Sequence, residues 1–508
     1  MKKILINKEP WQTRVAILQN EKLQDIYFDS ESKLDLERCF FKGKVSKVLP
    51  GIQTAFVDIG QAKSGFLHIT EIDRALASEK TAEFLQIDET KEQEAIEKKL
   101  KRAISIEKIL KEGDSILVQV LKEPVYEKGA KLTTCFTLPG KFVVLMPNIS
   151  QIGVSKKIED REERARLKEI LAKNLSPKMG AIIRTTAEGR SAKDIKKDLG
   201  FLVSSWKSIQ KKFKKAAIGE KIYEDLPLAI RATREHLDED ITEVITDNKK
   251  DQEAIIKFVK YYTPELVSKI KFYEGFPTLF EKFNIDGQIS SALHKKVPLK
   301  CGGSLIIETA EAMTVIDVNT GKFTGSGNME ETILTTNLEA AEETVRQLRL
   351  RNIGGLIVID FIDMASYANK QKLSKHLEKT LKEKDKYQSV ILKISEFGLV
   401  QMTRKRSGKT LVQQLTKVCP TCNSYGFVKS ETTISYDLLQ KFETDCLRNN
   451  IKGSVVFAVS PKIFNYIIHH EYNSILELEK KLNIKIILES NSSLEEEQFK
   501  IHKEQTES

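Results

Sequence analysis

The sequence predicts a multidomain protein of mixed α/β and α+β class, and three observations support this. The chain has 508 residues, which is too long for a single core when domains hold roughly 100–200 residues. Residues 38–70 form short apolar runs separated by turn signals such as Pro50-Gly51, a pattern typical of antiparallel strands. Residues 300–400 alternate apolar strands with long helices, which predicts an α/β layer.

The composition is that of a globular chain with a basic surplus. Hydrophobic residues make up 40% of the sequence, charged residues make up 30%, and the formal net charge is +10. Positive charge favours polyanions, but many basic proteins bind no nucleic acid. No run approaches the ~18 apolar residues of a membrane span, and the apolar run at residues 4–6 is too short for a signal peptide. Six cysteines are too few for a secreted disulfide framework, so we expect a protein of the reducing cytoplasm.

Short strands dominate the first quarter of the chain. Apolar runs at residues 4–6 and 15–18 predict strands of a small sheet. Residues 71–113 are highly charged with helical spacing, which predicts a solvated helical insertion. Strand character returns at residues 115–124 and completes about five strands, the number in an OB-type barrel.

The rest of the chain changes character several times. Residues 126–218 mix apolar strands with charged helices and predict a second module, whereas residues 220–275 give little clear signal. After the α/β layer, in which we place the chemistry, the short segment 401–430 carries a cysteine pair. Residues 431–500 predict a separate α/β region.

Two aspartates near strand ends are the strongest candidates for chemistry. Asp317 and Asn319 lie two residues apart on a predicted strand, so their side chains point to the same face. Asp360 ends an apolar strand, where a carboxylate is costly unless it is paired or bound to a cation. Two such aspartates at one sheet edge would suit Mg²⁺, which takes one or two carboxylates together with water and substrate phosphate. The alternative is that each aspartate caps a helix or pairs with an arginine, and spacing alone leaves it open.

Two further pairs of residues could contact a nucleic acid. Phe56 and Phe66 lie on neighbouring strands of the predicted barrel, where aromatic rings either stack on unpaired bases or fill the barrel core. Arg184 and Thr185 follow a short apolar strand, and a guanidinium beside a hydroxyl could hold a terminal phosphate. A surface salt bridge is the plainer interpretation of Arg184.

Cys419 and Cys422 have the spacing of metal ligands, but a structural zinc site needs four. Either scattered cysteines such as Cys135, Cys301 or Cys446 complete the site, or a second chain does. A redox pair is the alternative, although the sequence gives no thioredoxin-like βαβ context around the two cysteines.

Several blocks of sequence resemble the catalytic core of the ribonuclease E/G family in order and spacing. They are TVIDVNTG, NLEAAEETVRQLRLRNIGGLIVIDFIDM and MTRKRSGKTL, followed by VCPTC. The chain ends soon after a small C-terminal domain and so is most like the short ribonuclease G form. The resemblance implies RNase H-like and DNase I-like layers beside an OB-fold barrel. The implied domains are 1–36 with 219–280 (RNase H-like), 37–125 (OB-fold with the charged insertion), 126–218 (5′-end sensor), 281–400 (DNase I-like, catalytic), 401–430 (zinc-link) and 431–508 (small C-terminal domain).

The resemblance also implies a reaction. The residues matching the family's catalytic set are Asp317 and Asp360, which hold a catalytic Mg²⁺, and Asn319, which supports them. A metal-activated water would attack the scissile phosphate in line and leave 5′-phosphate and 3′-hydroxyl ends. Asp363 is a weaker ligand candidate, which we interpret either as supporting the metal ligands without touching the metal or as structural. We therefore expect a magnesium-dependent endoribonuclease that cuts single-stranded RNA in rRNA and tRNA processing and mRNA decay.

Two RNA contacts are implied in the same way. Phe56, Phe66 and a lysine matching Lys128 would hold RNA beside the catalytic site. The residues matching the family's 5′-monophosphate sensor are Gly140, Val144, Arg184 and Thr185. The resemblance thus predicts a preference for 5′-monophosphorylated RNA. The position of one further sensor arginine of the family falls near Gln388 in this chain. Recognition of the 5′-monophosphate is therefore weakened here, or another basic residue takes the place of that arginine.

For the cysteine pair, the resemblance favours a zinc shared between two chains, which makes a homodimer or homotetramer through the zinc-link. Two other kinds of protein compete with the enzyme: a non-catalytic RNA-binding protein that uses only the OB-fold, and a structural zinc-linked scaffold. Asp317, Asn319 and Asp360 discriminate between them, because a binding module needs no magnesium site.

Overall fold

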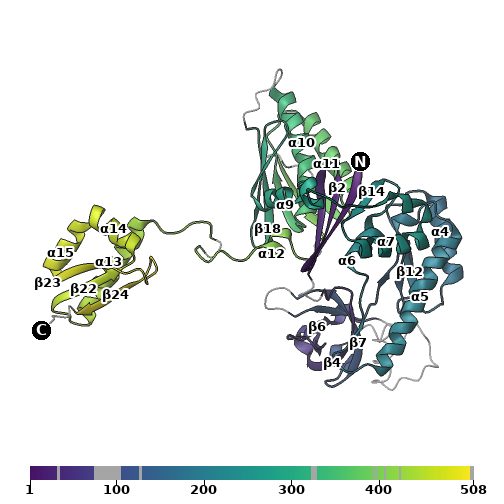
Figure 1. The fold of residues 1–508 in the computed structure, drawn as a ribbon, viewed down its shortest axis with the longest axis horizontal. Coiled ribbons are helices and arrows are strands. Elements are labelled where there is room, and N and C mark those ends of the chain that lie inside the picture. Colours follow the sequence, from purple (N-terminus) through teal and green to yellow (C-terminus); the bar gives the residue numbers. More distant parts are fainter. Residues whose placement is uncertain are drawn as a thin grey trace. The chain divides into compact units, whose positions relative to one another are not determined.

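The structure is a computed structural model that describes residues 1–30, 35–73, 105–124, 129–321, 329–392, 395, 398–405, 408–422 and 425–503. The chain divides into two compact units, residues 1–415 and 416–508 (Figure 1). Strands and helices are interleaved in both units, which confirms the predicted mixed α/β multidomain class. In the described part of the chain, no helix has the length and apolar character needed to cross a membrane.

The first sheet joins strands from two distant parts of the chain. It is formed by β1 (Lys2–Glu9), β2 (Gln12–Gln19), β3 (Lys22–Ser30), β14 (Ile241–Thr246) and β15 (Ile270–Phe272), in the order β15-β14-β1-β2-β3. Helices lie on both faces: α6 (Leu228–His236) and α7 (Lys249–Tyr262) on one, α8 (Leu279–Lys282) and α9 (Ile285–Leu293) on the other. Ile4 and Ile6 pack toward α6 and α7, while Leu5 packs toward α8 and α9. The segments predicted as one discontinuous domain thus share a sheet, and its RNase H-like character stays a prediction.

The second sheet closes into a barrel. Its strands are β4 (Phe40–Leu49), β5 (Thr54–Asp58), β6 (Gly65–His68), β8 (Lys131–Thr133) and β7 (Ser115–Lys122), and β7 pairs back with β4. Five closed strands confirm the predicted OB-like barrel. A short strand, β13 (Lys221–Tyr223), adds to β4 from outside. Most of the predicted helical insertion at 71–113 falls outside the described residues, which contain only its end, α3 (Ile106–Ile109).

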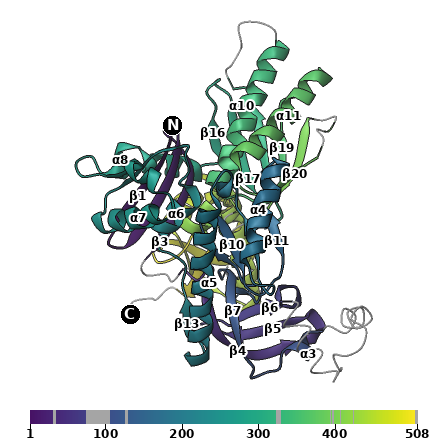
Figure 2. The same cartoon turned by 90° about the vertical axis from the view of Figure 1, so that its right-hand side faces the viewer.

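The third sheet has the order β11-β12-β10-β9. Its elements are β9 (Leu138–Pro139), β10 (Val143–Met146), β11 (Ile152–Val154) and β12 (Gly180–Ile183), with the helices α4 (Arg161–Asn174) and α5 (Ala192–Lys215). The buried side of α5 contributes Leu202 and Trp206 to the core of this module. Phe40 of the barrel belongs to the same core, so the barrel and the third sheet are packed together (Figure 2).

The fourth sheet is covered by two helices on one face. The strands are β16 (Lys296–Pro298), β17 (Ser304–Thr309), β18 (Met313–Asn319), β19 (Gly355–Asp360), β20 (Ser389–Ile391) and β21 (Leu399–Arg404), and the helices are α10 (Met329–Leu350) and α11 (Tyr367–Lys384). Ile316, Val318 and Ile359 pack into the core beneath the helices. Because side chains alternate along a strand, Asp317 and Asp360 lie on the opposite face.

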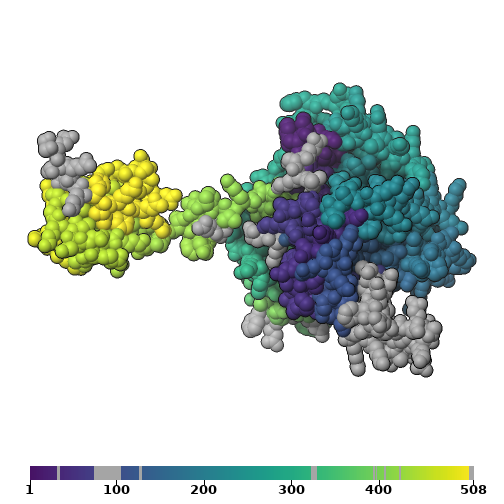
Figure 3. Space-filling model, turned by 90° about the horizontal axis from the view of Figure 1, so that it is seen from below, coloured from purple at the N-terminus to yellow at the C-terminus, as the bar shows by residue number. Residues whose placement is uncertain are grey.

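The second unit is a separate α/β body, whose surface Figure 3 shows in light green and yellow. Its elements are α13 (Glu431–Arg448), β22 (Gly453–Val459), α14 (Pro461–His470), α15 (Tyr472–Leu482), β23 (Ile484–Ser490) and β24 (Phe499–Lys503). β22 and β23 are parallel and are joined through α14 and α15, while β24 runs antiparallel to β22. A short helix, α12 (Leu411–Leu415), ends the first unit.

Candidate active site and nucleic-acid contacts

Asp317 and Asp360 are direct partners across the parallel strands β18 and β19. Neighbouring strands lie about 4.8 Å apart, so the two carboxylates project side by side from one sheet face. Asn319 Nδ2 donates a hydrogen bond of 2.7 Å to Asp317 Oδ2. Asp317 is half-buried, whereas Asn319 and Asp360 are exposed. The structure therefore brings together the three residues that the sequence singles out as catalytic candidates.

Among the described residues, Asp317 and Asp360 have no cationic partner. Partial loss of hydration at the sheet surface raises the pKa of Asp360, and the nearby carboxylates of Asp317 and Asp363 raise it further. Within the described ranges, no lysine or arginine forms an ion pair with Asp317 or Asp360. Both residues lie in strands, so the alternative that they cap helices or pair with arginines fails for the part of the chain described.

The donor set fits Mg²⁺ better than a metal that needs a full protein cage. Among the described residues, no group of three or more histidine, cysteine, aspartate or glutamate side chains could hold a metal ion. Mg²⁺ requires only one or two carboxylates, because water and substrate phosphate complete its octahedral shell. Asp317 and Asp360 meet that requirement.

A buried asparagine fixes the backbone beyond Asp360. Asn337 lies in α10 and has no exposed surface. Its Nδ2 donates to Ile362 O at 2.8 Å, and its Oδ1 accepts from Ile362 N at 3.1 Å. The sequence analysis did not single out Asn337. An asparagine among the apolar positions of a predicted helix could have indicated a buried hydrogen-bonding role. Asp363, the residue after Ile362, is exposed.

Phe56 and Phe66 face each other directly across β5 and β6. Both rings are half-buried, and neither belongs to the barrel core, which takes their neighbours Ala55, Val57 and Leu67. The alternative that both fill the core is therefore wrong. Lys128, the third residue implied for this surface, lies outside the residues that the structure describes.

The four predicted sensor residues lie at the third sheet: Val144 is on β10, Gly140 follows β9, and Arg184 and Thr185 follow β12. Arg184 Nη1 donates to Gly140 O at 2.8 Å, and Val144 lies on β10, opposite Ile182 of β12. Thr185 is exposed, with its Oγ1 3.2 Å from Ser155 Oγ.

Arg184 also forms an ion pair, which agrees with the expectation of a salt bridge at this residue. The partner is Glu235 in α6. Burial alone would raise the pKa of Glu235, but the guanidinium groups of Arg184, Arg234 and Arg38 lower it to about 2. Sequence reasoning missed Glu235, because it lies 51 residues away in a segment without a clear pattern.

The segment around Gln388 lies against the third-sheet module. Lys157 Nζ donates to Asp385 O at 2.9 Å, and Lys382 pairs with Glu159. Gln388 itself is exposed, and its carbonyl oxygen accepts from Lys405 N at 3.0 Å. The position near which a sensor arginine was expected therefore carries no charge, although lysines lie along the same contact.

The cysteine pair supplies two of the four ligands that a structural zinc site would need. Cys419 is exposed, and hydrogen bonds from Cys422 and Thr421 lower the pKa of its thiol, which favours the thiolate that binds metals. Cys446 is buried in the core of the second unit, so it cannot complete the set. A zinc ion bound by Cys419 and Cys422 would need two further ligands.

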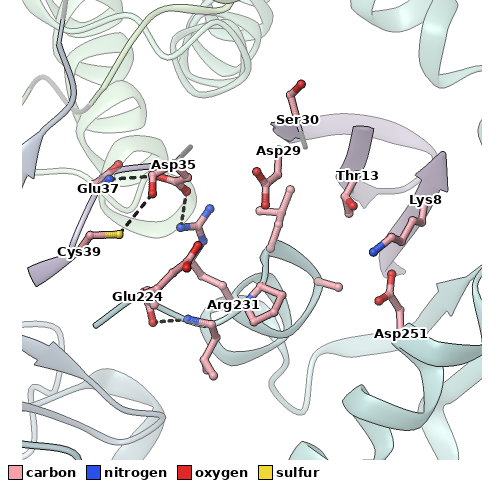
Figure 4. Close-up of a pocket in the computed structure, with 15 residues that line it drawn as sticks. Lys8, Thr13, Asp29, Ser30, Asp35, Glu37, Cys39, Glu224, Arg231 and Asp251 are labelled. Carbon is pink, nitrogen blue, oxygen red and sulfur yellow. Dashed lines mark hydrogen bonds and ion pairs between the residues drawn. The ribbon is translucent and has the colours of Figure 1, made fainter. Parts of the chain in front are cut away.

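A second cluster of carboxylates lines a cavity of about 460 Å³ at the first sheet (Figure 4). Unlike the β18–β19 pair, two of its acids, Asp35 and Asp225, form ion pairs with arginines. Asp35 lies 2.7 Å from an Arg231 nitrogen. Asp225 accepts from both Nη atoms of Arg234, at 2.8 and 3.0 Å, and both side chains are 3% exposed. We therefore do not place the metal here.

Comparison with known proteins gives two family matches and several relatives. A model described as the Ribonuclease E/G family matches residues 137–407, and one described as the RNase E/G thioredoxin-like domain matches residues 418–504. Ribonuclease G of Escherichia coli (strain K12) is 36% identical over 98% of this chain and 99% of its own length. Ribonuclease G of Haemophilus influenzae is 36% identical over 98% of each chain. Ribonuclease E of the same organism is 34% identical over 99% of this chain but 52% of its own length.

The second family match corrects one expectation. The sequence gave no thioredoxin-like context near the cysteines, yet the match begins at residue 418, and β22 and β23 form a parallel unit through α14 and α15. Periodicity predicted a separate α/β region at residues 431–500, but it does not show how strands and helices are connected in space. Cys419 and Cys422 still precede α13 in the described chain, with no strand leading into a helix at the motif.

Proposed function

Because the chain belongs to the ribonuclease E/G family and is therefore an endoribonuclease, we propose that it cuts single-stranded RNA with Mg²⁺ held at Asp317 and Asp360. The proposed setting is rRNA and tRNA processing and mRNA decay in the cytoplasm. Family membership disfavours the two alternatives, a non-catalytic OB-fold RNA-binding protein and a zinc-linked scaffold.

The observation that carries this proposal is the carboxylate pair on β18 and β19, which has no cationic partner among the described residues. A bound Mg²⁺ would activate water at neutral pH and stabilise negative charge on the scissile phosphate. Asn319 fixes the orientation of the Asp317 carboxylate through its hydrogen bond, and Asn337 holds the backbone that follows Asp360. Attack of water on the phosphate, with departure of the 3′-oxygen, leaves 5′-phosphate and 3′-hydroxyl ends.

The barrel would hold the strand that is cut. Phe56 and Phe66 lie opposite each other outside the barrel core, where each ring offers a stacking surface to an unpaired base, at about 1–3 kcal/mol per base. Stacking tolerates any base, so this surface would prefer single strands without reading a sequence. Lys128 is proposed as its cationic contact.

We place recognition of a 5′-monophosphate at Gly140, Val144, Arg184 and Thr185. Arg184 uses one donor on Gly140 O and one on Glu235, and a guanidinium has five donors, so a phosphate could still bind it. The exposed Thr185 hydroxyl would add a second contact. Because Gln388 carries no charge, the preference for 5′-monophosphorylated RNA should be modest.

The cysteine pair would hold a zinc ion shared by two chains. Cys419 and Cys422 supply two thiolates, a tetrahedral site takes four ligands, and a second copy of the chain would supply the other two. The proposed assembly is a homodimer, or a homotetramer built from such dimers.

End mapping on purified protein tests the reaction. The substrates are one RNA sequence made with a 5′-monophosphate and with a 5′-triphosphate, each incubated with Mg²⁺ or with a chelator. We expect internal cuts with 5′-phosphate and 3′-hydroxyl ends in Mg²⁺ alone, and somewhat faster cutting of the monophosphorylated RNA. Cleavage in the chelator, or 2′,3′-cyclic phosphate ends, would contradict the proposal.

A further inference from the structure

The helix α5 carries an unusual amount of positive charge for its length. Its 24 residues, Ala192–Lys215, include eight lysines and only two aspartates. All eight lysines are exposed. They are Lys193, Lys196, Lys197, Lys207, Lys211, Lys212, Lys214 and Lys215.

The lysines occupy one side of the helix. From Lys193 to Lys197, and again from Lys207 through Lys211 to Lys215, they recur every four residues, the spacing of one helical face. The buried positions, such as Leu202 and Trp206, lie on the other side. At 1.5 Å per residue, the lysine face extends over about 33 Å from Lys193 to Lys215.

Neither aspartate of α5 neutralises this face. Asp194 belongs to the N-terminal cap, where its carboxylate accepts from Ser191 Oγ at 2.6 Å. Asp198 is fully buried and accepts from the backbone N–H groups of residues 141–143. Across the described residues, none of the eight lysines forms an ion pair with a carboxylate.

Another lysine-rich helix of the same unit behaves differently. α11 carries six lysines in 18 residues, and three of them pair with glutamates. An ordinary solvated surface mixes both signs of charge in this way. The lysine face of α5 does not.

Stability does not explain the charge. Like charges four residues apart destabilise a helix, and Lys193 in the first turn opposes the helix dipole, which favours acids there. Only the lysines of the last turn complement the dipole. An unpaired face of this kind is instead complementary to an external polyanion.

Aromatic rings accompany the lysines. Phe201 is 48% exposed on the same helix, and Tyr261 is 44% exposed, with Lys197 Nζ 3.7 Å from its ring centroid. α5 also runs from the third sheet to β13 on the barrel (Figure 2). There Lys42 of β4 lies 5.3 Å from the Phe213 ring, so positive charge continues onto the barrel.

We propose that the lysine face of α5 binds the phosphate backbone of substrate RNA outside the segment being cut. The inference rests on the proposed function, because it takes RNA as the substrate. Lysines contact phosphates as point charges and carry no sequence information, so the surface would add affinity for long RNA of any sequence. A membrane surface fits less well, because a membrane-binding helix must offer an apolar face and that of α5 is buried in the core.

The test compares two triple variants of the full-length enzyme. K207Q/K211Q/K214Q removes three charges from α5, and K372Q/K375Q/K379Q removes three from exposed positions of α11. Each is assayed on a short RNA that holds only the cut segment, and on the same segment with long flanks. For the α5 variant, KM on the flanked RNA should rise about 10-fold with kcat unchanged. The slope of log Kd against log salt should fall by roughly 2, at ~0.7–0.9 per phosphate contact.

The other outcomes decide against the inference. Equal effects of the two triple variants would mean that total charge matters rather than α5. Equal effects on the short and the flanked RNA would mean that the helix acts on the cut segment. If the α5 variant lost binding to phosphatidylglycerol vesicles but kept wild-type KM on flanked RNA, the partner would be a membrane. If the wild-type enzyme cut neither RNA, the proposed function itself would have failed.

Discussion

Two groups of carboxylates among the described residues of the first unit differ in whether cationic side chains neutralise them. At the cavity of the first sheet, Asp225 lies in a buried bidentate pair with Arg234, and Asp35 pairs with Arg231. At the edge of β18 and β19, Asp317 and Asp360 have each other and no cation among the described residues. Acidic side chains that stabilise a fold form ion pairs with cationic side chains of the protein. Acidic side chains that bind a cation are left without such partners, and the bound cation neutralises them.

The largest expected effect is on catalysis. Asp317→Asn or Asp360→Asn should lower cleavage more than about 100-fold, because loss of groups outside a metal's own ligands already costs 10–100-fold. RNA binding should stay close to wild type, since neither change alters a stacking surface. Turnover of the cut-segment RNA and its Kd in the chelator measure the two quantities. Near-normal turnover in either variant would remove both residues from the active site.

The opposite result is expected at the cavity. Asp225→Ala leaves Arg234 buried without its main partner, which should cost about 3 kcal/mol of unfolding free energy. The folded enzyme should keep its kcat, because this pair does not touch the reacting groups. Urea unfolding measures the loss of stability, and single-turnover cleavage by the same preparation measures the activity of the folded enzyme. A wild-type unfolding midpoint would show that the pair is not structural.

The cysteine pair, like the β18–β19 carboxylates, is proposed to bind a metal ion. Cys422→Ser should lower the zinc content from about half an ion per chain to nearly none, since a tetrahedral site shared by two chains needs all four thiolates. The dimer should then dissociate more readily, because metal binding contributes to association. Metal analysis and sedimentation at several protein concentrations test this. One zinc per chain, or a zinc-free dimer of unchanged stability, would contradict it.

A smaller effect should appear in the pH dependence of stability. The pKa of Glu235 is lowered to about 2 by its arginine partners, so its contribution is complete above its ordinary pKa near 4.5 and is lost as pH falls toward 2. The difference in unfolding free energy between wild type and Glu235→Gln should be constant above about pH 5.5 and shrink in acid. A difference that grows as pH falls would reverse the assigned sign.

The sequence predicted best those features that depend on residues close together in the chain. A strand places residues two apart on one face, so Asp317 and Asn319 could be predicted together, and Asp360 followed from its apolar run. The count of short strands predicted the closed barrel. The resemblance to a known family, rather than periodicity, supplied the roles of these residues.

Contacts between distant segments could not be predicted in this way. The pair of Glu235 with Arg184 depends on how α6 packs against the third sheet. No spacing rule connects residues in separate modules. Strand β13 joins the barrel for the same reason, from a segment in which the sequence gave little signal.

Binding of Mn²⁺ to the intact enzyme, followed by electron paramagnetic resonance in the absence of RNA, tests the central claim most directly. Mn²⁺ accepts the same oxygen ligands as Mg²⁺. Wild type and Asp225→Ala should both bind one Mn²⁺ per chain at Asp317 and Asp360, and the double variant Asp317→Asn/Asp360→Asn should lose that ion. If the double variant binds Mn²⁺ as wild type does while Asp225→Ala loses it, the metal lies at the cavity and the account is wrong.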